Sequence, residues 1–157
     1  MSSSGAVRQS VQDRDGVSPF DPLWSRIRLD ALAVIEADPA MTGLMQQAVL
    51  NHHDFAHAVA ARVACRLARP AFDYDCLYQQ FSNLLDQRPA LVDGMAADCL
   101  AVLDRDPACT RLLEPLLYFK GFHALQTHRF AHTLWANGRH DFALYLQSRS
   151  SEVFQTD

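Results

Sequence analysis

The feature of this sequence that most constrains the fold is a helical spacing of apolar residues that prolines interrupt and that resumes after them. Three of these prolines follow an aspartate, at Asp21-Pro22, Asp38-Pro39 and Asp106-Pro107. Aspartate is a preferred helix N-cap, and proline suits the first helical position because no backbone N–H is needed there. No segment shows the two-residue alternation or the β-branched enrichment that is typical of strands. The sequence therefore predicts an all-α fold.

The apolar periodicity predicts about six to eight helices. The first is expected to end at Asp38-Pro39. The stretch from Met41 to Leu67, rich in Ala, Leu and Val, follows it and ends at Arg69-Pro70. Asp73 is expected to cap the next helix, and Pro89 to open the one after that.

The last third of the chain is its most apolar part. One side of a helix is expected to carry a row of mostly apolar residues, namely Leu117, Gly121, Ala124, Leu125, His128, His132 and Trp135. Asn137-Gly138 predicts the C-terminal stop of that helix. A final helix is expected to carry Phe142, Tyr145, Leu146 and Val153.

The chain is predicted to form one helical domain preceded by a tail. A length of 157 residues suffices for one domain with a core. Residues 1–20 are rich in Ser, Gly, Gln and Asp, and ordering them would cost conformational entropy without burying apolar surface. We therefore expect a disordered tail at 1–20 and a helical domain at 21–154.

Composition argues against several classes of partner. The net charge is −4, and Lys and Arg are scattered, which is not typical of proteins that bind nucleic acid or anionic lipid. No apolar run suits a signal peptide or a membrane span, so we expect a cytoplasmic protein without membrane contact. The four cysteines match neither a redox pair nor zinc knuckles, and we interpret them as reduced thiols that pack like small apolar residues.

The residues alone do not reveal an active site. His52, His53 and His57 are close in sequence, and His128 and His132 are four apart, but neither set completes a metal motif, so we predict structural histidines and no metal. There is no GxSxG elbow and no phosphate-binding glycine loop. By spacing alone, Asp106 is interpreted as a helix N-cap like the other Asp-Pro aspartates.

Several segments resemble the N-terminal part of serine acetyltransferases. The strongest are PLLYFKGFHALQ at 115–126, HRFAHTLWANGR at 128–139, and SRSSEVFQTD at 148–157. RDPA at 105–108 resembles the loop before them, and weaker similarity extends through DPLW at 21–24 and LNHHDF at 50–55. The chain is thus similar to this family over nearly everything after the tail.

The resemblance implies transfer of an acetyl group from acetyl-CoA to the hydroxyl of L-serine, in cysteine biosynthesis. In that family a histidine on a left-handed parallel β-helix removes the hydroxyl proton, which is general-base catalysis. Asp157 falls on the aspartate that orients this histidine, and Asp106 falls on an aspartate that helps to bind serine. Acetyl-CoA is expected as co-substrate, and no cofactor is implied.

The resemblance also implies that the β-helix is absent from this chain, with residues 155–157 at its start. The catalytic histidine and the acetyl-CoA site would lie beyond Asp157, so we expect the chain by itself to be inactive. The family assembles as a hexamer, a dimer of trimers, through its N-terminal domains, and binds O-acetylserine sulfhydrylase through a C-terminal tail that is absent here. We therefore expect self-association, with a dimer as the simplest form. The alternative is a stand-alone helical oligomerisation or regulatory module without catalysis.

Overall fold

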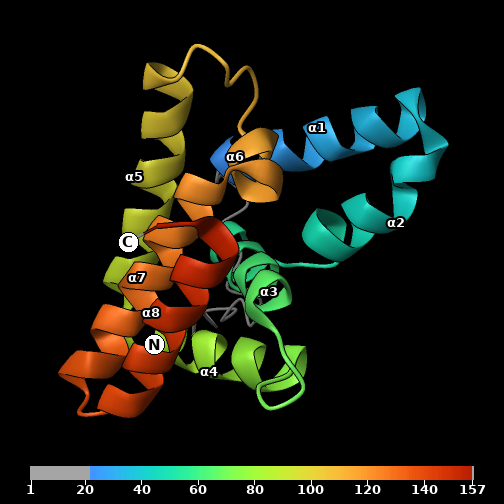
Figure 1. The fold of residues 1–157 in the computed structure, drawn as a ribbon. Helices are drawn as coiled ribbons and strands as arrows, with labels where there is room; N and C mark the ends of the chain where they lie inside the picture. The colour runs from blue at the N-terminus through green and yellow to red at the C-terminus, as the bar shows by residue number, and fades with distance from the viewer. Residues whose placement is uncertain (1–21, 157) are drawn as a thin grey trace, which may run out of the picture.

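The computed structural model describes residues 22–156, which form helices and the loops that connect them (Figure 1). The α-helices are α1 (Pro22–Ala37), α2 (Thr42–Met45), α3 (Phe55–Leu67), α4 (Tyr74–Gln87), α5 (Pro89–Arg105), α6 (Leu113–Tyr118), α7 (Lys120–Ala136) and α8 (His140–Phe154). A 3-10 helix, η1 (Pro39–Met41), and a π-helical turn, η2 (Gln46–Leu50), flank α2. Residues 22–156 contain no strand, so the all-α prediction is confirmed. The predicted tail at 1–20 lies outside the described residues.

Helix α3 lies at the centre of the bundle and packs against α4, α5, α6, α7 and α8. Nine of its residues are buried, five of them alanines. Because alanine side chains are small, they let neighbouring helices approach closely. Figure 1 shows α5, α7 and α8 running side by side along one flank, while α1 and α2 extend away on the other.

Aspartates begin several of these helices. Oδ1 of Asp73 accepts a hydrogen bond from Cys76 N at 2.9 Å, which confirms the predicted cap of α4. Oδ1 of Asp38 accepts from Ala40 N at 3.1 Å at the start of η1. The stretch from Met41 to Leu67 is divided by a break near residues 51–54, where Asp54 Oδ1 accepts from His57 N at 2.8 Å and caps α3. The apolar pattern does not predict this break, although Asp54 is the residue type that marks it.

Three arginines donate hydrogen bonds to backbone carbonyls at the C-terminal ends of helices that are distant from them in sequence. Arg28 donates to Leu50 O at 3.2 Å, and Arg62 donates to Leu117 O at 2.8 Å. Arg149, only 6% exposed, donates to Leu67 O at 3.2 Å, at the end of α3. The last carbonyls of a helix lack partners within it, so these bonds satisfy acceptors that would otherwise be buried unpaired.

Helices α7 and α8 form a hairpin joined by a tight turn. Gly138 has a φ of +77°, in the left-handed region that glycine adopts without steric cost. Arg139 N donates to Leu134 O at 2.9 Å, and Gly138 N donates to Trp135 O at 3.0 Å. This pair of bonds is a Schellman motif, and it confirms the predicted stop at Asn137-Gly138.

The predicted side of α7 is the exposed one. His128 and His132 are exposed, and Leu125 and Trp135 are 42% and 50% exposed. The buried residues are Phe122, His123, Gln126, Thr127, Phe130, Thr133 and Leu134. The polarity of the residues did not identify the exposed face of α7, because polar threonines lie on the buried face. Their hydroxyls are satisfied within the helix, where Thr127 donates to His123 O and Thr133 donates to Arg129 O. A break at Phe119 also separates α6 from α7, where the apolar pattern predicts one helical run.

Two smaller expectations are also corrected. Cys99 and Cys109 are buried, but Cys65 and Cys76 are exposed, so the interpretation of all four as packed thiols was wrong for half of them. The helical spacing of Val92, Met95 and Cys99 predicts that all three share one apolar face of α5; Met95 and Cys99 are buried, whereas Val92 is 37% exposed.

Helix α5, which leads to the candidate site, is fixed against α7 by a partly buried polar contact. Asp98 accepts from Arg129 Nε at 2.8 Å and from Arg129 Nη2 at 2.9 Å, and also from Gln126 Nε2 at 3.0 Å. A Cβ at Gly94 would lie 2.9 Å from Arg129 Nη1, so the glycine leaves room for this guanidinium. The bidentate pair therefore fixes α5 against α7.

Candidate substrate-binding loop

Asp106 lies where α5 ends and a loop to α6 begins. That loop runs across the top of the view in Figure 1. Its N–H donates to Val102 O at 2.9 Å, the last turn of α5. Oδ1 accepts from Ala108 N at 2.9 Å, and Asp106 O accepts from Cys109 N at 2.9 Å. These bonds make a closed turn around the side chain. No helix begins at Pro107, since α6 starts at Leu113, so the interpretation of Asp106 as an N-cap was wrong.

The carboxylate of Asp106 keeps binding capacity after it has formed this turn. A carboxylate can accept about four hydrogen bonds. Within the described residues the side chain of Asp106 accepts one, from Ala108 N. The residue is partly exposed, so the remaining lone pairs are accessible from solvent. A fixed and accessible carboxylate of this kind can bind a cationic group such as an ammonium ion.

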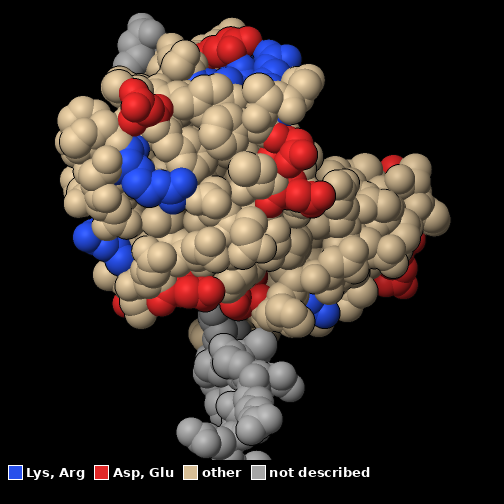
Figure 2. Space-filling model, turned by 90° about the horizontal axis from the view of Figure 1, so that it is seen from below, with Lys and Arg blue, Asp and Glu red and all other residues tan. Residues whose placement is uncertain are grey.

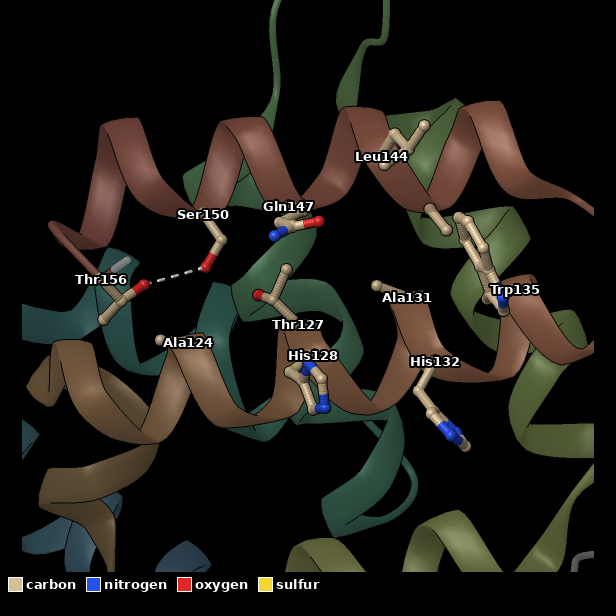
Figure 3. Close-up of a pocket in the computed structure, with 11 residues that line it drawn as sticks. Ala124, Thr127, His128, Ala131, His132, Trp135, Leu144, Gln147, Ser150 and Thr156 are labelled. Carbon is tan, nitrogen blue, oxygen red and sulfur yellow. Dashed lines mark hydrogen bonds between the residues drawn. The ribbon is translucent and has the colours of Figure 1, made fainter.

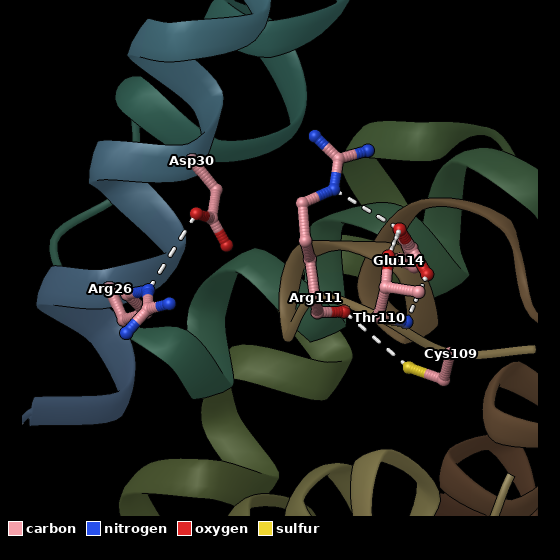
Figure 4. A network of polar contacts seen from close by, with 6 residues as sticks. All are labelled: Arg26, Asp30, Cys109, Thr110, Arg111 and Glu114. Carbon is pink, nitrogen blue, oxygen red and sulfur yellow. Dashed lines mark hydrogen bonds and ion pairs between the residues drawn. The ribbon is translucent and has the colours of Figure 1, made fainter. Parts of the chain in front are cut away.

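Glu114, in the first turn of α6, accepts hydrogen bonds from Thr110 and Arg111, in the C-terminal half of the loop (Figure 4). Its Oε2 accepts from Thr110 N at 2.9 Å, and its Oε1 accepts from Thr110 Oγ1 at 2.9 Å. Arg111 Nε donates to Oε1 at 3.1 Å. Burial alone would raise the pKa of Glu114, but the bonds from Thr110 and Arg111 outweigh it and hold that pKa below its usual range. The carboxylate is therefore ionised at neutral pH.

The loop also has a buried side. Cys99 Sγ donates to Leu112 O at 3.6 Å, and Cys109 Sγ donates to Arg111 O at 3.5 Å. Burial raises the pKa of Cys99 to about 12, so this thiol remains protonated at neutral pH. Because the thiolate is the reactive form, Cys99 is a structural residue and not a nucleophile.

Glu114 was not predicted as a site residue from the sequence. The sequence feature that could have indicated it is its position, four residues after Thr110 and at the start of a short apolar helix. Asp157, the other predicted site residue, lies outside the described residues. The structure therefore does not test whether Asp157 and Asp106 belong to one site, and both roles stay predictions.

The histidines contact different partners. His57 Nδ1 lies 2.9 Å from Asp54 Oδ2, and this hydrogen bond raises the pKa of His57. His52 Nε2 lies 2.9 Å from Gln47 O. The rings of His128 and His132 are 6.3 Å apart on the exposed side of α7. Among residues 22–156, no group of three or more His, Cys, Asp or Glu side chains is arranged to hold a metal ion.

A groove of about 400 Å³ runs between α7 and α8 (Figure 3). Thr127 of α7 and Gln147 and Ser150 of α8 point into the space between the helices. The lining residues are Ala124, Thr127, His128, Ala131, His132, Trp135, Ala143, Leu144, Gln147, Ser150 and Thr156. None of them is a carboxylate. The groove thus differs in chemistry from the Asp106 loop.

Charge is dispersed on the face shown in Figure 2, where small groups of Lys and Arg and small groups of Asp and Glu are separated by uncharged residues. No helix among the described residues is long and apolar enough to cross a membrane.

A match to a family model identifies the helical bundle as the amino-terminal domain of an acyltransferase family. Residues 23–127 match the family described as serine acetyltransferase, N-terminal. The chain belongs to the serine acetyltransferase family.

Individual relatives agree with this assignment. The chain is 33% identical, over 96% of its length, to serine acetyltransferase 3, mitochondrial, of Arabidopsis thaliana, and 35% identical, over 86%, to serine acetyltransferase of Haemophilus influenzae. It covers 39% and 51% of those two proteins, so it spans about half or less of their length.

Solved structures share the fold. Serine acetyltransferase from Brucella abortus strain S19 superimposes with a TM-score of 0.85 at 46% identity, over 87% of this chain and 56% of that one. The enzyme from Neisseria gonorrhoeae, solved in complex with serine, gives a TM-score of 0.84 at 38% identity, over 86% of this chain and 56% of that one.

Proposed function

We propose that this chain serves a serine O-acetyltransferase, which transfers the acetyl group of acetyl-CoA to L-serine and gives O-acetyl-L-serine for cysteine biosynthesis. Membership of the family supports the reaction class. The Neisseria relative was solved in complex with serine and the Brucella relative with coenzyme A, which supports the two substrates. A cytoplasmic location and a sulfhydrylase partner stay predictions.

The role proposed for this chain is to bind the amino-acid substrate. In the reaction the serine hydroxyl loses its proton, its oxygen bonds to the acetyl carbon, and the carbon–sulfur bond breaks to release coenzyme A. The resemblance assigns the proton transfer to a histidine outside this chain, oriented by Asp157. Asp106 is proposed to accept the ammonium group of serine, and the observation that carries this is the accessible carboxylate fixed by Ala108 N.

Substitution of Asp106 by asparagine is expected to raise the KM for serine about tenfold in the full-length protein, because a charge-assisted hydrogen bond is about twice as strong as a neutral one. The KM for acetyl-CoA should change less than about twofold, since the substitution removes no proposed contact with acetyl-CoA. The melting temperature should stay nearly constant, because asparagine retains the oxygen that accepts from Ala108 N. Steady-state kinetics and thermal unfolding measure these quantities.

Asp38→Asn is the matched control. Asp38 also precedes a proline and also accepts from the N–H two residues later, at 3.1 Å. The sequence around it does not resemble the family's loop, so serine kinetics should be unchanged. Normal serine kinetics in Asp106→Asn, with Asp106→Ala merely less stable, would show that Asp106 only closes a turn.

We also propose that the helical domain self-associates, with a dimer as the simplest form. Leu29 and Leu32, three residues apart on α1, are 63% and 51% exposed. Exposed apolar side chains that cluster on one surface favour association.

Light scattering at tens of micromolar, roughly the range where weak interfaces associate, should therefore give a mass above 17.6 kDa. Glutamate at both Leu29 and Leu32 should reduce this mass. The same substitution at Leu144, which is 51% exposed on α8, should not. A monomer in the unsubstituted protein would contradict the proposal.

A further inference from the structure

We propose that Glu114 is a positioning residue for substrate binding, which holds the loop from Asp106 to Leu112 in the form that receives the ammonium group of serine. This inference rests on the proposed role of Asp106. It adds a residue that does not itself touch the substrate and acts through the conformation of the loop.

Three hydrogen-bond donors converge on the carboxylate of Glu114. The backbone N–H and the hydroxyl of Thr110, and the guanidinium of Arg111, all donate to Glu114 over 2.9 to 3.1 Å. Both donor residues are exposed, whereas the side chain of Glu114 is only 15% exposed. The loop thus folds around a carboxylate that is mostly shielded from solvent, and Figure 4 shows Thr110 and Arg111 directed toward it.

The loop is held in two halves by two different carboxylates. Its first half is held by bonds that belong to Asp106, from Ala108 N and Cys109 N. Its second half is held by Glu114, through Thr110 and Arg111. Cys109 links the halves, because its N–H donates to Asp106 O and its thiol to Arg111 O. A shift of Thr110 and Arg111 would therefore be transmitted through Cys109 to the turn that orients the Asp106 carboxylate.

A purely structural role of Glu114 would have different effects. An acidic residue in the first turn stabilises a helix by interaction with its N-terminal dipole. That interaction would affect the stability of α6 without regard to serine. The two roles are separated by measuring whether the effect of Glu114 depends on Asp106.

The test uses the full-length protein with Glu114→Ala, Glu114→Gln, Asp106→Asn and the double variant Asp106→Asn with Glu114→Ala. Asp104→Ala is the matched control, since it removes one acidic residue from the exposed end of α5 beside the loop. Serine and acetyl-CoA kinetics are measured on each variant. Hydrogen–deuterium exchange reports the protection of the Ala108 and Cys109 amides, independently of activity.

Glu114→Ala is expected to raise the KM for serine about tenfold, because misplacing a binding group by about 1 Å weakens its interaction strongly. The KM for acetyl-CoA and kcat should change little. Glu114→Gln should recover most of the loss, since its amide oxygen can still accept from Thr110. The double variant should be no worse than Asp106→Asn alone, and Glu114→Ala should speed exchange at Ala108 and Cys109.

Independent, additive effects of the two substitutions would overturn the positioning role, as would unchanged amide exchange in Glu114→Ala. Failure of the proposed function gives a different result. If the unsubstituted protein transfers no acetyl group to serine, or if Asp106→Asn keeps the normal KM for serine, the role of Asp106 falls, whatever the exchange rates are. The two failures are therefore distinguishable.

Discussion

Replacement of Phe130 by alanine is expected to lower the free energy of unfolding by about 3 to 5 kcal/mol, the usual cost of deleting a large buried aromatic side chain. Phe130 of α7 is fully buried. Its ring stacks on that of Phe81 of α4, with centroids 4.2 Å apart and planes inclined by 7°. The substitution removes apolar surface from the core and also leaves a cavity beside Phe81. Denaturant unfolding followed by circular dichroism measures the loss.

Leu125→Ala is the control on the same helix. Leu125 was expected on a common side with Leu117, yet it is 42% exposed. Its replacement should change the stability by less than about 1 kcal/mol, since little buried surface is lost. Equal losses for the two variants would show that Phe130 does not lie on the buried face of α7.

Acidification from pH 6.5 to pH 4 is expected to remove about 3 kcal/mol of stability through His123 alone, because each unit of pKa shift corresponds to about 1.4 kcal/mol. His123 is fully buried, and its Nε2 lies 2.7 Å from Leu116 O. Burial lowers the pKa of His123 to about 4, and the charges of Arg66 and Arg62 add to the effect. Between these pH values the unfolded chain binds a proton that the folded chain excludes. The contribution is complete above pH 6.5 and is lost as the pH falls.

The variant His123→Phe isolates this effect, because a phenyl ring does not titrate and His123 already contacts the rings of Phe122 and Phe154. Its stability should depend less on pH in this range, although the bond to Leu116 O is lost. His132→Phe, on the exposed side of α7, should keep the dependence of the unsubstituted protein. Carboxylates titrate in all three proteins, so their contribution cancels in the comparison. Equal slopes in all three would contradict the assignment.

The fold was predictable where the sequence contains local signals. Asp38 and Asp73 cap their helices through bonds to nearby N–H groups, and Gly138 ends α7 through its positive φ. These features depend on residue type and spacing alone. The exposed face of α7 was not predictable, because both sides of that helix carry apolar residues and the polar groups on the buried side, such as Thr127, are bonded within the helix.

The candidate site was predictable only in part. Resemblance to the family pointed to Asp106, while its spacing before a proline suggested an N-cap that the structure does not contain. The distinction depends on the residues after Pro107, which form a turn and not a helix. Glu114 could not be assigned from sequence because its role depends on three donors that the loop brings together only when it is folded.

The central position of α3 has a consequence during translation. Its C-terminal carbonyl, Leu67 O, is bonded by Arg149, which is 82 positions later in the chain. At a synthesis rate of about 5–20 residues per second, α3 leaves the ribosome on the order of ten seconds before α8. Throughout that interval α8 is not available to cover its side of α3, whereas α4, α5 and α6 are made earlier. The nascent chain therefore carries α3, which has more buried residues than any other described helix, without its last partner until nearly the whole domain has been made.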